Sequence, residues 1–337
     1  MNNIHEQKGI SGLHNVGNTC YLNAAIQCLR HCTDLSKYIL SNDYKQFFKN
    51  NILEQNVVLT WHELIYNLWS SSESVNPINF VKCFIQASEN SNYSTFANFE
   101  QNDVDEFLAN IFNIMHTALS TKITMNVKGA PKNENDKHAI DAFKCWQSFF
   151  ENDYSIIVQQ FYSQYITKTS CPECSDVSFN YDPSLVVHLP IPDKEGEISL
   201  YDCLDLFTSE EELDSENKWE CEKCNIKSCA KRGIRFWNTS KYFIILLKRY
   251  TKDEKNNENI EIPEKLNLKK YAINYRTGKF NYSLSGICHH SGGLGGGHYY
   301  ATCKTNGQWV VYNDSSTTLV DKPDSNNAYC LFYKLIE

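Results

Sequence analysis

Residues 15–23 read Asn-Val-Gly-Asn-Thr-Cys-Tyr-Leu-Asn, so that a glycine and small polar residues lead directly into Cys20. An apolar segment follows, in which Leu22, Ile26 and Leu29 recur at the spacing of a buried helix face. Cys20 is therefore predicted at the first turn of a helix, where free backbone N–H groups and the helix dipole favour negative charge. A thiol placed there can have its pKa lowered from about 8.5 to roughly 3.5–7.5, and the thiolate is the nucleophile.

One cysteine among 14 is more often a buried structural residue than a nucleophile, so Cys20 alone does not establish catalysis. The chain of 337 residues can hold one large domain or two ordinary ones, and its 42% apolar content allows a sizeable core. The net charge of −8 disfavours nucleic acids and anionic membranes as partners. No apolar run is long enough for a transmembrane helix, and residues 1–9 do not resemble a signal peptide. We therefore expect a reducing compartment, cytoplasmic and/or nuclear.

The predicted secondary structure changes from mostly helical to mostly β-strand near residue 155. Residues 10–125 are predicted to be mostly helical, with helices at 60–69, 79–87 and 103–119. Residues 128–137 are predicted to form an exposed loop. The later part is rich in strands, with one helix at 199–207 capped by Ser199 and Asp202. The predicted strands cover 155–158, 161–169, 185–189, 242–250, 282–288, 299–304, 309–312 and 329–335.

Two C-x-x-C pairs predict a metal site. They are formed by Cys171 with Cys174 and by Cys221 with Cys224. Each pair can direct two thiolates at one ion, and two pairs complete the tetrahedral four-cysteine shell that zinc prefers. Four thiolates leave no open coordination position, so the predicted Zn²⁺ is structural and no cofactor is expected for catalysis. Cys229 lies close enough in sequence to be a competing ligand.

His298 is the strongest candidate for a catalytic base because it follows the glycine-rich residues 292–297 and begins a predicted strand. His289 and His290 compete for this role. A neutral imidazole must be held in one orientation, usually by a side-chain oxygen. Asn313 and Asp314 follow the next strand, and a hairpin of that length returns either one to His298. The arrangement is typical of a cysteine-protease site, although Asn-Asp-Ser alone is also a turn signal.

Five segments together resemble the ubiquitin-specific protease family of deubiquitinating enzymes. They span about residues 9–335 in the family's order. The matching segments are 15–23 (its cysteine box), 101–108 (Gln-Asn-Asp-Val-Asp-Glu-Phe-Leu), 247–250 (Leu-Lys-Arg-Tyr), 290–299 with 312–315 (its histidine box), and 328–333.

The resemblance implies an α+β, papain-like cysteine protease fold in a single catalytic domain at 9–337. A helical thumb would cover about 9–150, fingers with a zinc ribbon about 155–240, and a β-rich palm about 241–337. It further implies that Cys20 is the nucleophile, His298 the base and Asn313 the orienting residue, with Asp314 an auxiliary. Asn15 is implied as the side-chain donor to the oxyanion.

The implied reaction is hydrolysis of the bond after the C-terminal glycine of ubiquitin, through a thioester on Cys20. Asp103 and Glu106 would face arginines of the ubiquitin tail. The residues implied to line a narrow channel for its two glycines are Tyr250, His290, Gly297 and Tyr299. The sequence departs from the family pattern at Asp105, where His or Gln is common, at Ser163, where glycine is usual, and at Tyr250, where phenylalanine is commoner.

The implied partners are ubiquitin and ubiquitinated proteins, and we expect the enzyme to be a monomer. Three alternatives to an active deubiquitinase remain open. The chain could be a ubiquitin-binding module without activity, an enzyme for another ubiquitin-like modifier, or a general peptidase. The intact set of Cys20, His298 and Asn313 argues against the first of these.

Overall fold

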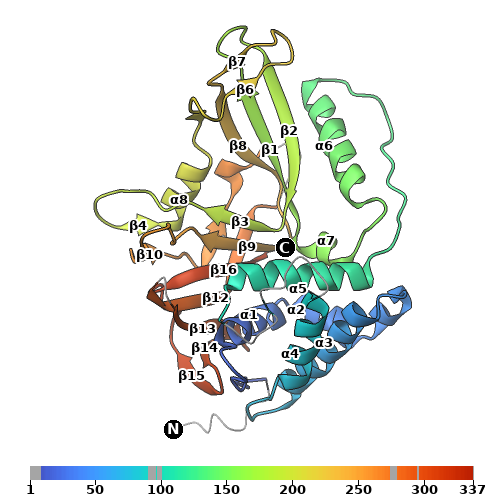
Figure 1. The fold of residues 1–337 in the computed structure, drawn as a ribbon, viewed down its shortest axis with the longest axis vertical. Coiled ribbons are helices and arrows are strands. Elements are labelled where there is room, and N and C mark those ends of the chain that lie inside the picture. The colour runs from blue at the N-terminus through green and yellow to red at the C-terminus, as the bar shows by residue number, and fades with distance from the viewer. Residues whose placement is uncertain (1–8, 90–95, 97–100, 274–278, 294–295, 337) are drawn as a thin grey trace.

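The computed structural model describes residues 9–89, 96, 101–273, 279–293 and 296–336. Helices dominate the first half of the described chain, as the sequence predicts (Figure 1). They are α1 (Cys20–Arg30), α2 (Thr33–Leu40), the 3₁₀ helix η2 (Asp43–Phe47), α3 (Ile52–Ser70), α4 (Ile78–Glu89), α5 (Val104–Leu119), α6 (Glu134–Phe150) and α7 (Ile156–Phe161). The second half adds α8 (Leu200–Phe207) and the 3₁₀ helix η4 (Lys269–Tyr271).

The largest sheet has its strands in the order β15-β14-β13-β12-β16-β9-β3, with β11 also paired to β12. Its neighbours are antiparallel except for β3 and β9, which run parallel. The strands are β3 (Val186–Leu189), β9 (Tyr242–Leu247), β11 (Lys265–Asn267), β12 (Asn281–Gly293), β13 (Gly296–Thr305), β14 (Gln308–Asn313), β15 (Ser316–Val320) and β16 (Ala328–Leu335).

A second, four-stranded sheet forms the long extension at the top of Figure 1, in the order β2-β1-β8-β5. Two short pairs complete the described strands, β4 with β10 and β6 with β7. These strands are β1 (Ser163–Ser170), β2 (Val177–Ser184), β4 (Ile198–Ser199), β5 (Glu211–Glu212), β6 (Trp219–Glu220), β7 (Lys227–Ser228), β8 (Lys231–Asn238) and β10 (Ile260–Glu261).

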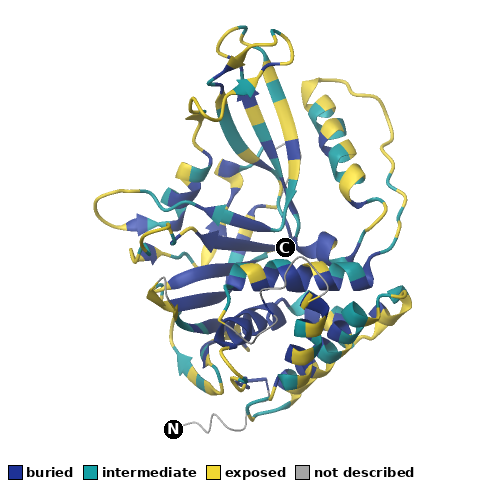
Figure 2. Cartoon of the chain, viewed as in Figure 1, coloured by how far each residue is buried: buried dark blue, intermediate teal, exposed yellow. Residues whose placement is uncertain are grey.

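Helix α1 lies at the centre of the core. All of its residues are buried, because it packs between α5 on one side and β12 and β13 on the other (Figure 2). Strand β9 is also buried along its whole length, which explains its continuous apolar sequence. The first turn of α1, which carries Cys20, is therefore held against the strand that carries His298.

Residues 155–158 were predicted as a strand, and this prediction is wrong. Ser155 accepts hydrogen bonds from the backbone N–H groups of Ile157 and Val158, and so starts helix α7. The β-branched residues favour a strand only weakly, and here the cap and the burial of their side chains outweigh that preference. Phe161 at the end of α7 packs on Phe112 of α5, with ring centroids 4.6 Å apart.

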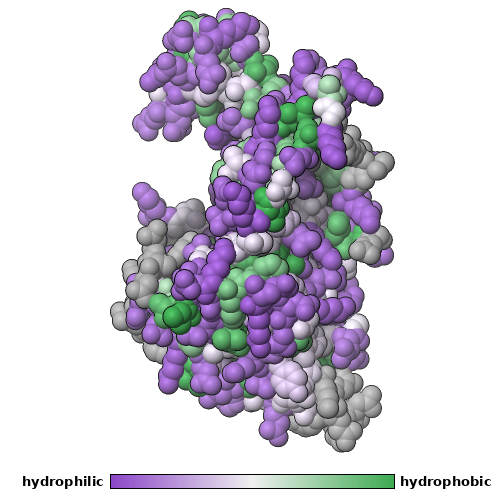
Figure 3. Space-filling view, turned by 90° about the vertical axis from the view of Figure 1, so that its right-hand side faces the viewer, coloured by the Kyte–Doolittle hydropathy of each residue, from purple (hydrophilic) through white to green (hydrophobic). Residues whose placement is uncertain are grey.

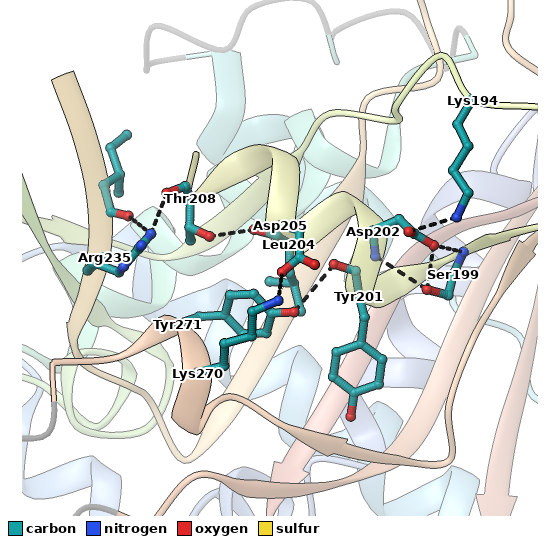
Figure 4. Close-up of polar contacts among 11 residues, drawn as sticks. Lys194, Ser199, Tyr201, Asp202, Leu204, Asp205, Thr208, Arg235, Lys270 and Tyr271 are labelled. Atoms are coloured by element: carbon teal, nitrogen blue, oxygen red, sulfur yellow. Dashed lines mark hydrogen bonds and ion pairs between the residues drawn. The ribbon is translucent and has the colours of Figure 1, made fainter. Parts of the chain in front are cut away.

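The predicted loop at 128–137 is too long, because Asn133 caps α6 and its first turn begins at Glu134. Helix α6 was missed because only Ala142 and Phe150 are fully buried in it, so its apolar stripe is weak. The helix predicted at 199–207 is confirmed as α8. Ser199 and Asp202 form the expected capping box, which Figure 4 shows together with the Lys194–Asp202 ion pair at 2.8 Å. Among the described helices, none is long and apolar enough to cross a bilayer.

Candidate active site

The segment before Cys20 is folded around the side chain of Asn15. Its Oδ1 atom accepts hydrogen bonds from the backbone N–H groups of Gly17 and Thr19, at 3.2 and 3.1 Å. Asn18 has a φ of 50°, in the left-handed region that asparagine tolerates well. This turn delivers Cys20 to the first position of α1, as the sequence predicts, with 4% of its surface exposed.

Cys20 lies next to the strand that carries the predicted base. The backbone N–H of Tyr299, the residue after His298, donates to the Cys20 sulfur. Residues almost 280 positions apart in sequence therefore meet at one point. Burial raises the pKa of the Cys20 thiol above its ordinary value, and the nearby Asp314 carboxylate raises it further. The lowered pKa expected for a thiol at a helix N-terminus is therefore not found for Cys20. Desolvation of the thiol outweighs the backbone N–H donors of Tyr299, Tyr21 and Cys20 itself.

The two candidate orienting residues face opposite ways. Asn313, at the end of β14, places its Oδ1 atom 2.6 Å from Nε2 of His298. Asp314 follows with a φ of 49°, which turns its side chain toward α1. There its two carboxylate oxygens accept from Nδ2 of Asn15 at 3.1 Å and from Nδ2 of Asn23 at 2.8 Å. Asn313 thus contacts the imidazole, and Asp314 ties together the two asparagines that flank Cys20.

The two competing histidines are occupied elsewhere. His289 is fully buried, with its ring nitrogens hydrogen-bonded to the carbonyl of Asn326 and the hydroxyl of Thr302, and burial lowers its pKa to about 4. The Tyr250 hydroxyl contacts Nδ1 of His290. Burial, followed by the charges of Lys255 and His298, lowers the pKa of His290 to about 4. Neither ring is free to face Cys20.

The residues expected to line the channel for a substrate tail lie together. Ring centroids are 5.8 Å apart for Tyr250 and His290, and 4.4 Å apart for His290 and Tyr299. A Cβ atom at Gly297 would come within 2.4 Å of the His290 ring nitrogen Nε2, so only glycine fits there. Gln101 holds this glycine from the helical side, with Nε2 2.5 Å from its carbonyl. Leu294 and Gly295 of the glycine-rich segment lie outside the described residues, whereas 292–293 pair with 296–297.

Asp103 and Glu106, which were expected to face the ubiquitin tail, differ in their exposure to solvent. Asp103 caps α5 and accepts hydrogen bonds from the hydroxyls of Tyr299 at 2.8 Å and Tyr329 at 2.9 Å. Burial raises the pKa of Asp103. Glu106 remains exposed on the same turn, and burial together with the charges of Asp103 and Asp105 raises its pKa. Glu106 therefore presents its carboxylate to solvent, and Asp103 mainly organises the tyrosines.

Three residues of this site were not singled out from sequence: Asn23, Gln101 and Lys255. Asn23 had a signal, because it lies three residues after Cys20 and so on the same helix face. Gln101 and Lys255 act through contacts with strands far along the chain, and no spacing in the sequence reports such contacts.

The four predicted metal ligands converge at the far end of the four-stranded sheet. Their Sγ atoms all lie within 4.8 Å of one another. Ser175 and Asn225 have φ angles of 58° and 56°, and each donates its N–H to the carbonyl of the first cysteine of its pair. The two C-x-x-C turns thus share one geometry. Cys229 is not part of this cluster.

The cluster fits zinc in size as well as in donor type. Zn–S bonds of about 2.3 Å in a regular tetrahedron separate sulfur atoms by about 3.8 Å. The Cys171–Cys224 and Cys174–Cys221 sulfur separations are 3.8 and 3.6 Å. The four-cysteine cluster therefore has the geometry of a closed structural zinc site.

A groove of about 1140 Å³ lies beside α6, where Ile140, Phe143 and Trp146 face Trp237 and Phe280. Figure 3 shows the corresponding side of the molecule, where hydrophobic patches interrupt a mostly hydrophilic surface. None of the residues around Cys20 lines this groove, so we do not place the reaction there.

The site combines a thiol on a helix N-terminus, an imidazole on a facing strand and an amide behind the imidazole. The fold combines a helical thumb, a sheet palm and fingers that end in the four cysteines. Together these features define the papain-like cysteine protease fold. The family model described as ubiquitin carboxyl-terminal hydrolase matches residues 11–333. The chain belongs to this family, and the fold expected from the resemblance is confirmed.

Human ubiquitin carboxyl-terminal hydrolase 2 is 32% identical over 350 residues, which cover 99% of this chain and 56% of the relative. Human ubiquitin carboxyl-terminal hydrolase 21 is 30% identical over 356 residues, which cover 98% and 62%. Ubiquitin carboxyl-terminal hydrolase Usp2 of Drosophila melanogaster is 28% identical, covering 98% and 35%. The chain thus spans about a third to two thirds of the length of these curated relatives.

Solved structures share the fold. The SAGA Ubp8/Sgf11/Sus1/Sgf73 DUB module bound to ubiquitin aldehyde matches with a TM-score of 0.75 at 24% identity, covering 99% of this chain and 71% of that chain. The yeast SAGA DUB module with a mutant Sgf73 matches with a TM-score of 0.74 at 25% identity, covering 99% and 70%.

Proposed function

We propose that this chain is a thiol-dependent deubiquitinase that hydrolyses the isopeptide or peptide bond after the C-terminal glycine of ubiquitin. Membership of the ubiquitin carboxyl-terminal hydrolase family supports the substrate class. The observation that carries the proposal is the meeting of Cys20 with the His298 strand, together with the 2.6 Å contact between His298 and Asn313. These contacts bring the proposed nucleophile together with a proposed base and orienting residue that lie on two neighbouring strands far along the chain.

In the proposed reaction, Cys20 attacks the carbonyl carbon of the terminal glycine while His298 takes the thiol proton. Burial raises the pKa of the Cys20 thiol, which is why the proposal assigns acceptance of its proton to His298. His298 then protonates the departing lysine amine, and a thioester remains on Cys20. Water activated by His298 hydrolyses the thioester and releases ubiquitin. Asn313 holds the imidazole in one tautomer throughout.

Asn15 is proposed to stabilise the oxyanion. An amide nitrogen carries two protons, and Asp314 accepts only one of them from Asn15. The second proton remains for the developing negative charge, and Asp314 fixes its direction. Loss of such a donor costs on the order of a hundred- to a thousandfold in rate.

For the substrate tail, we propose a channel walled by Tyr250, His290 and Tyr299, with Gly297 on its floor. Gly297 has no side chain, so the His290 ring lies directly against its backbone, and this close packing favours a substrate that ends in two glycines. Glu106 would pair with an arginine of the tail, and Asp103 would hold Tyr299 and Tyr329 in place.

We also propose that the four-cysteine cluster holds one structural Zn²⁺. When bound, the ion would cross-link the β1–β2 turn to the β6–β7 turn and stabilise the fingers. The chain's own thiolates fill all four positions, so the site takes no part in hydrolysis.

A ubiquitin probe with an electrophile at its C-terminus tests the proposed activity. We expect covalent labelling of the wild-type protein and none of Cys20→Ala. Tight binding without an adduct would indicate an inactive ubiquitin-binding module. Faster turnover of conjugates of another modifier would change the substrate, and efficient cleavage of short peptides would indicate a general peptidase.

We further propose a reducing location, cytoplasmic and/or nuclear, and a monomeric state. All 14 cysteines have free thiols, including Cys28 and Cys288, whose sulfur atoms are 3.5 Å apart. Light scattering of the purified protein would test the monomeric state, and imaging of a tagged protein would test the location.

A further inference from the structure

Strand β12 loses one of its two neighbours just before it reaches the active site. It pairs with β13 as far as Gly293, but its pairing with β16 ends at His289 and Ala328. The His290 N–H still donates to the carbonyl of Asn327. Backbone N–H and C=O groups point to the same edge of a strand at every second residue. Beyond the end of β16, the carbonyls of His290 and Gly292 therefore point to the edge of β12 that β16 no longer covers. No strand of the described chain lies opposite them.

The side chain of Lys255 fills this position. Its Nζ atom donates to the carbonyl of His290 at 2.7 Å and to that of Gly292 at 3.0 Å, and it lies 3.3 Å from Nδ1 of the His290 ring. Lys255 is itself fixed by a backbone bridge to Tyr250. An ammonium group has three protons and no acceptor, so one lysine can satisfy two adjacent carbonyls. Hydrogen bonds from a charged donor are about twice as strong as neutral ones.

The contacts of Lys255 bear directly on the proposed channel. The β12–β13 tip carries Gly297 and His298, and Gln101 holds it from the opposite side through the carbonyl of Gly297. Gly297 can sit against the His290 ring only while that ring keeps its position. Movement of β12 at His290 would therefore displace the His290 ring and Gly297, which belong to the proposed channel.

We propose that Lys255 is a positioning residue that replaces the missing strand at the edge of β12 and fixes the channel for the ubiquitin tail. This inference rests on the proposed function for its kinetic consequence. Lys255 does not touch the reacting atoms; it acts through His290 and Gly292.

The kinetic test compares Lys255→Met, Lys255→Arg and Lys252→Met on a fluorogenic ubiquitin C-terminal amide. Methionine keeps most of the apolar stem and removes the donors. We expect Lys255→Met to raise KM about tenfold with kcat changed less than about threefold, because the loss of charged hydrogen bonds affects the channel. Lys255→Arg should recover most of the affinity. Lys252→Met, an exposed control in the same loop, should match the wild type.

A second measurement does not depend on ubiquitin. Hydrogen exchange of the unliganded protein should be faster in Lys255→Met at residues 289–293 and 296–299, and unchanged in α3. An unaltered exchange rate there, or a fall in kcat with unchanged KM, would overturn the inference. If the wild-type protein fails to hydrolyse the ubiquitin amide, the proposed function fails, and the exchange experiment still decides whether Lys255 fixes the strand.

Discussion

The molecule contains two cysteine sites that are built in opposite ways. At the fingers, each C-x-x-C turn is made from residues close in sequence, and a left-handed residue at Ser175 or Asn225 closes the turn. At the candidate active site, Cys20, His298 and Asn313 come from one helix and two strands of the large sheet, and no short segment contains them. Each half of the first site is prepared locally and the fold brings the two turns together, whereas the second site is prepared entirely by the fold.

This difference has chemical consequences. The four finger sulfurs lie within 4.8 Å of one another, which suits a metal that supplies the balancing charge. Cys20 is buried beside a carboxylate, and both features raise the pKa of its thiol. The metal cluster can thus serve stability, whereas the chemistry proposed for Cys20 needs a base that the rest of the fold brings to it.

The largest expected effect is on the local site. Cys171→Ser should reduce bound zinc from about one per chain to nearly none and lower the melting temperature strongly. Structural zinc sites in small peptides are worth about 10–16 kcal/mol at pH 7. Elemental analysis and calorimetry measure both quantities, with Cys229→Ser as the matched control. A wild-type protein without zinc would contradict the prediction and remove one side of the comparison.

At the candidate active site, Cys20→Ala should lower kcat/KM for a ubiquitin amide by about 10⁴-fold or more, because no other thiol takes its position. Cys83→Ala, which removes a half-buried thiol on α4, should leave the rate unchanged. Steady-state kinetics measure both variants. Residual activity of Cys20→Ala within tenfold of the wild type would show that the nucleophile lies elsewhere.

Replacement of the orienting residue should have a smaller effect. Asn313→Ala removes the acceptor at Nε2 of His298 and should lower kcat on the order of a hundredfold, with ubiquitin binding retained. Asn313→Asp keeps an oxygen in the same place and should retain much of the rate. Single-turnover kinetics measure the rate of the chemical step, and a separate binding assay measures the affinity for ubiquitin. Equal losses in both variants would assign Asn313 a folding role.

The smallest expected change concerns the negative charge beside Cys20. The Asp314 carboxylate disfavours the Cys20 thiolate, so Asp314→Asn should lower the pKa of that thiol. Alkylation of Cys20 by iodoacetamide rises with the thiolate fraction, and its midpoint should therefore move to lower pH. Mass spectrometry across a pH series measures this, with the exposed Asp321→Asn as control. A midpoint that stays in place or rises would contradict the assignment.

Much of the molecule could be predicted from short patterns. The C-x-x-C spacing predicted the two halves of the four-cysteine cluster, and Ser199 with Asp202 predicted the cap of α8, because each such turn or cap depends on neighbours within a few residues. The strand predicted at 155–158 failed because the Ser155 cap and packing against α5 outweighed β-branched composition. Helix α6 was not predicted from the sequence because few of its residues are buried, so its apolar face is weak.

Local patterns were enough to specify the residue types of both cysteine sites and the start of α1, since caps, turns and periodic apolar residues act over a few positions. The packing of the folded chain decided that Asn313 reaches His298 while Asp314 turns to Asn15 and Asn23. It also decided that Cys20 is buried enough to raise the pKa of its thiol, and that Lys255 reaches the edge of β12. The physical reason is that desolvation and contacts between remote strands depend on the packed chain, and local spacing carries no information about them.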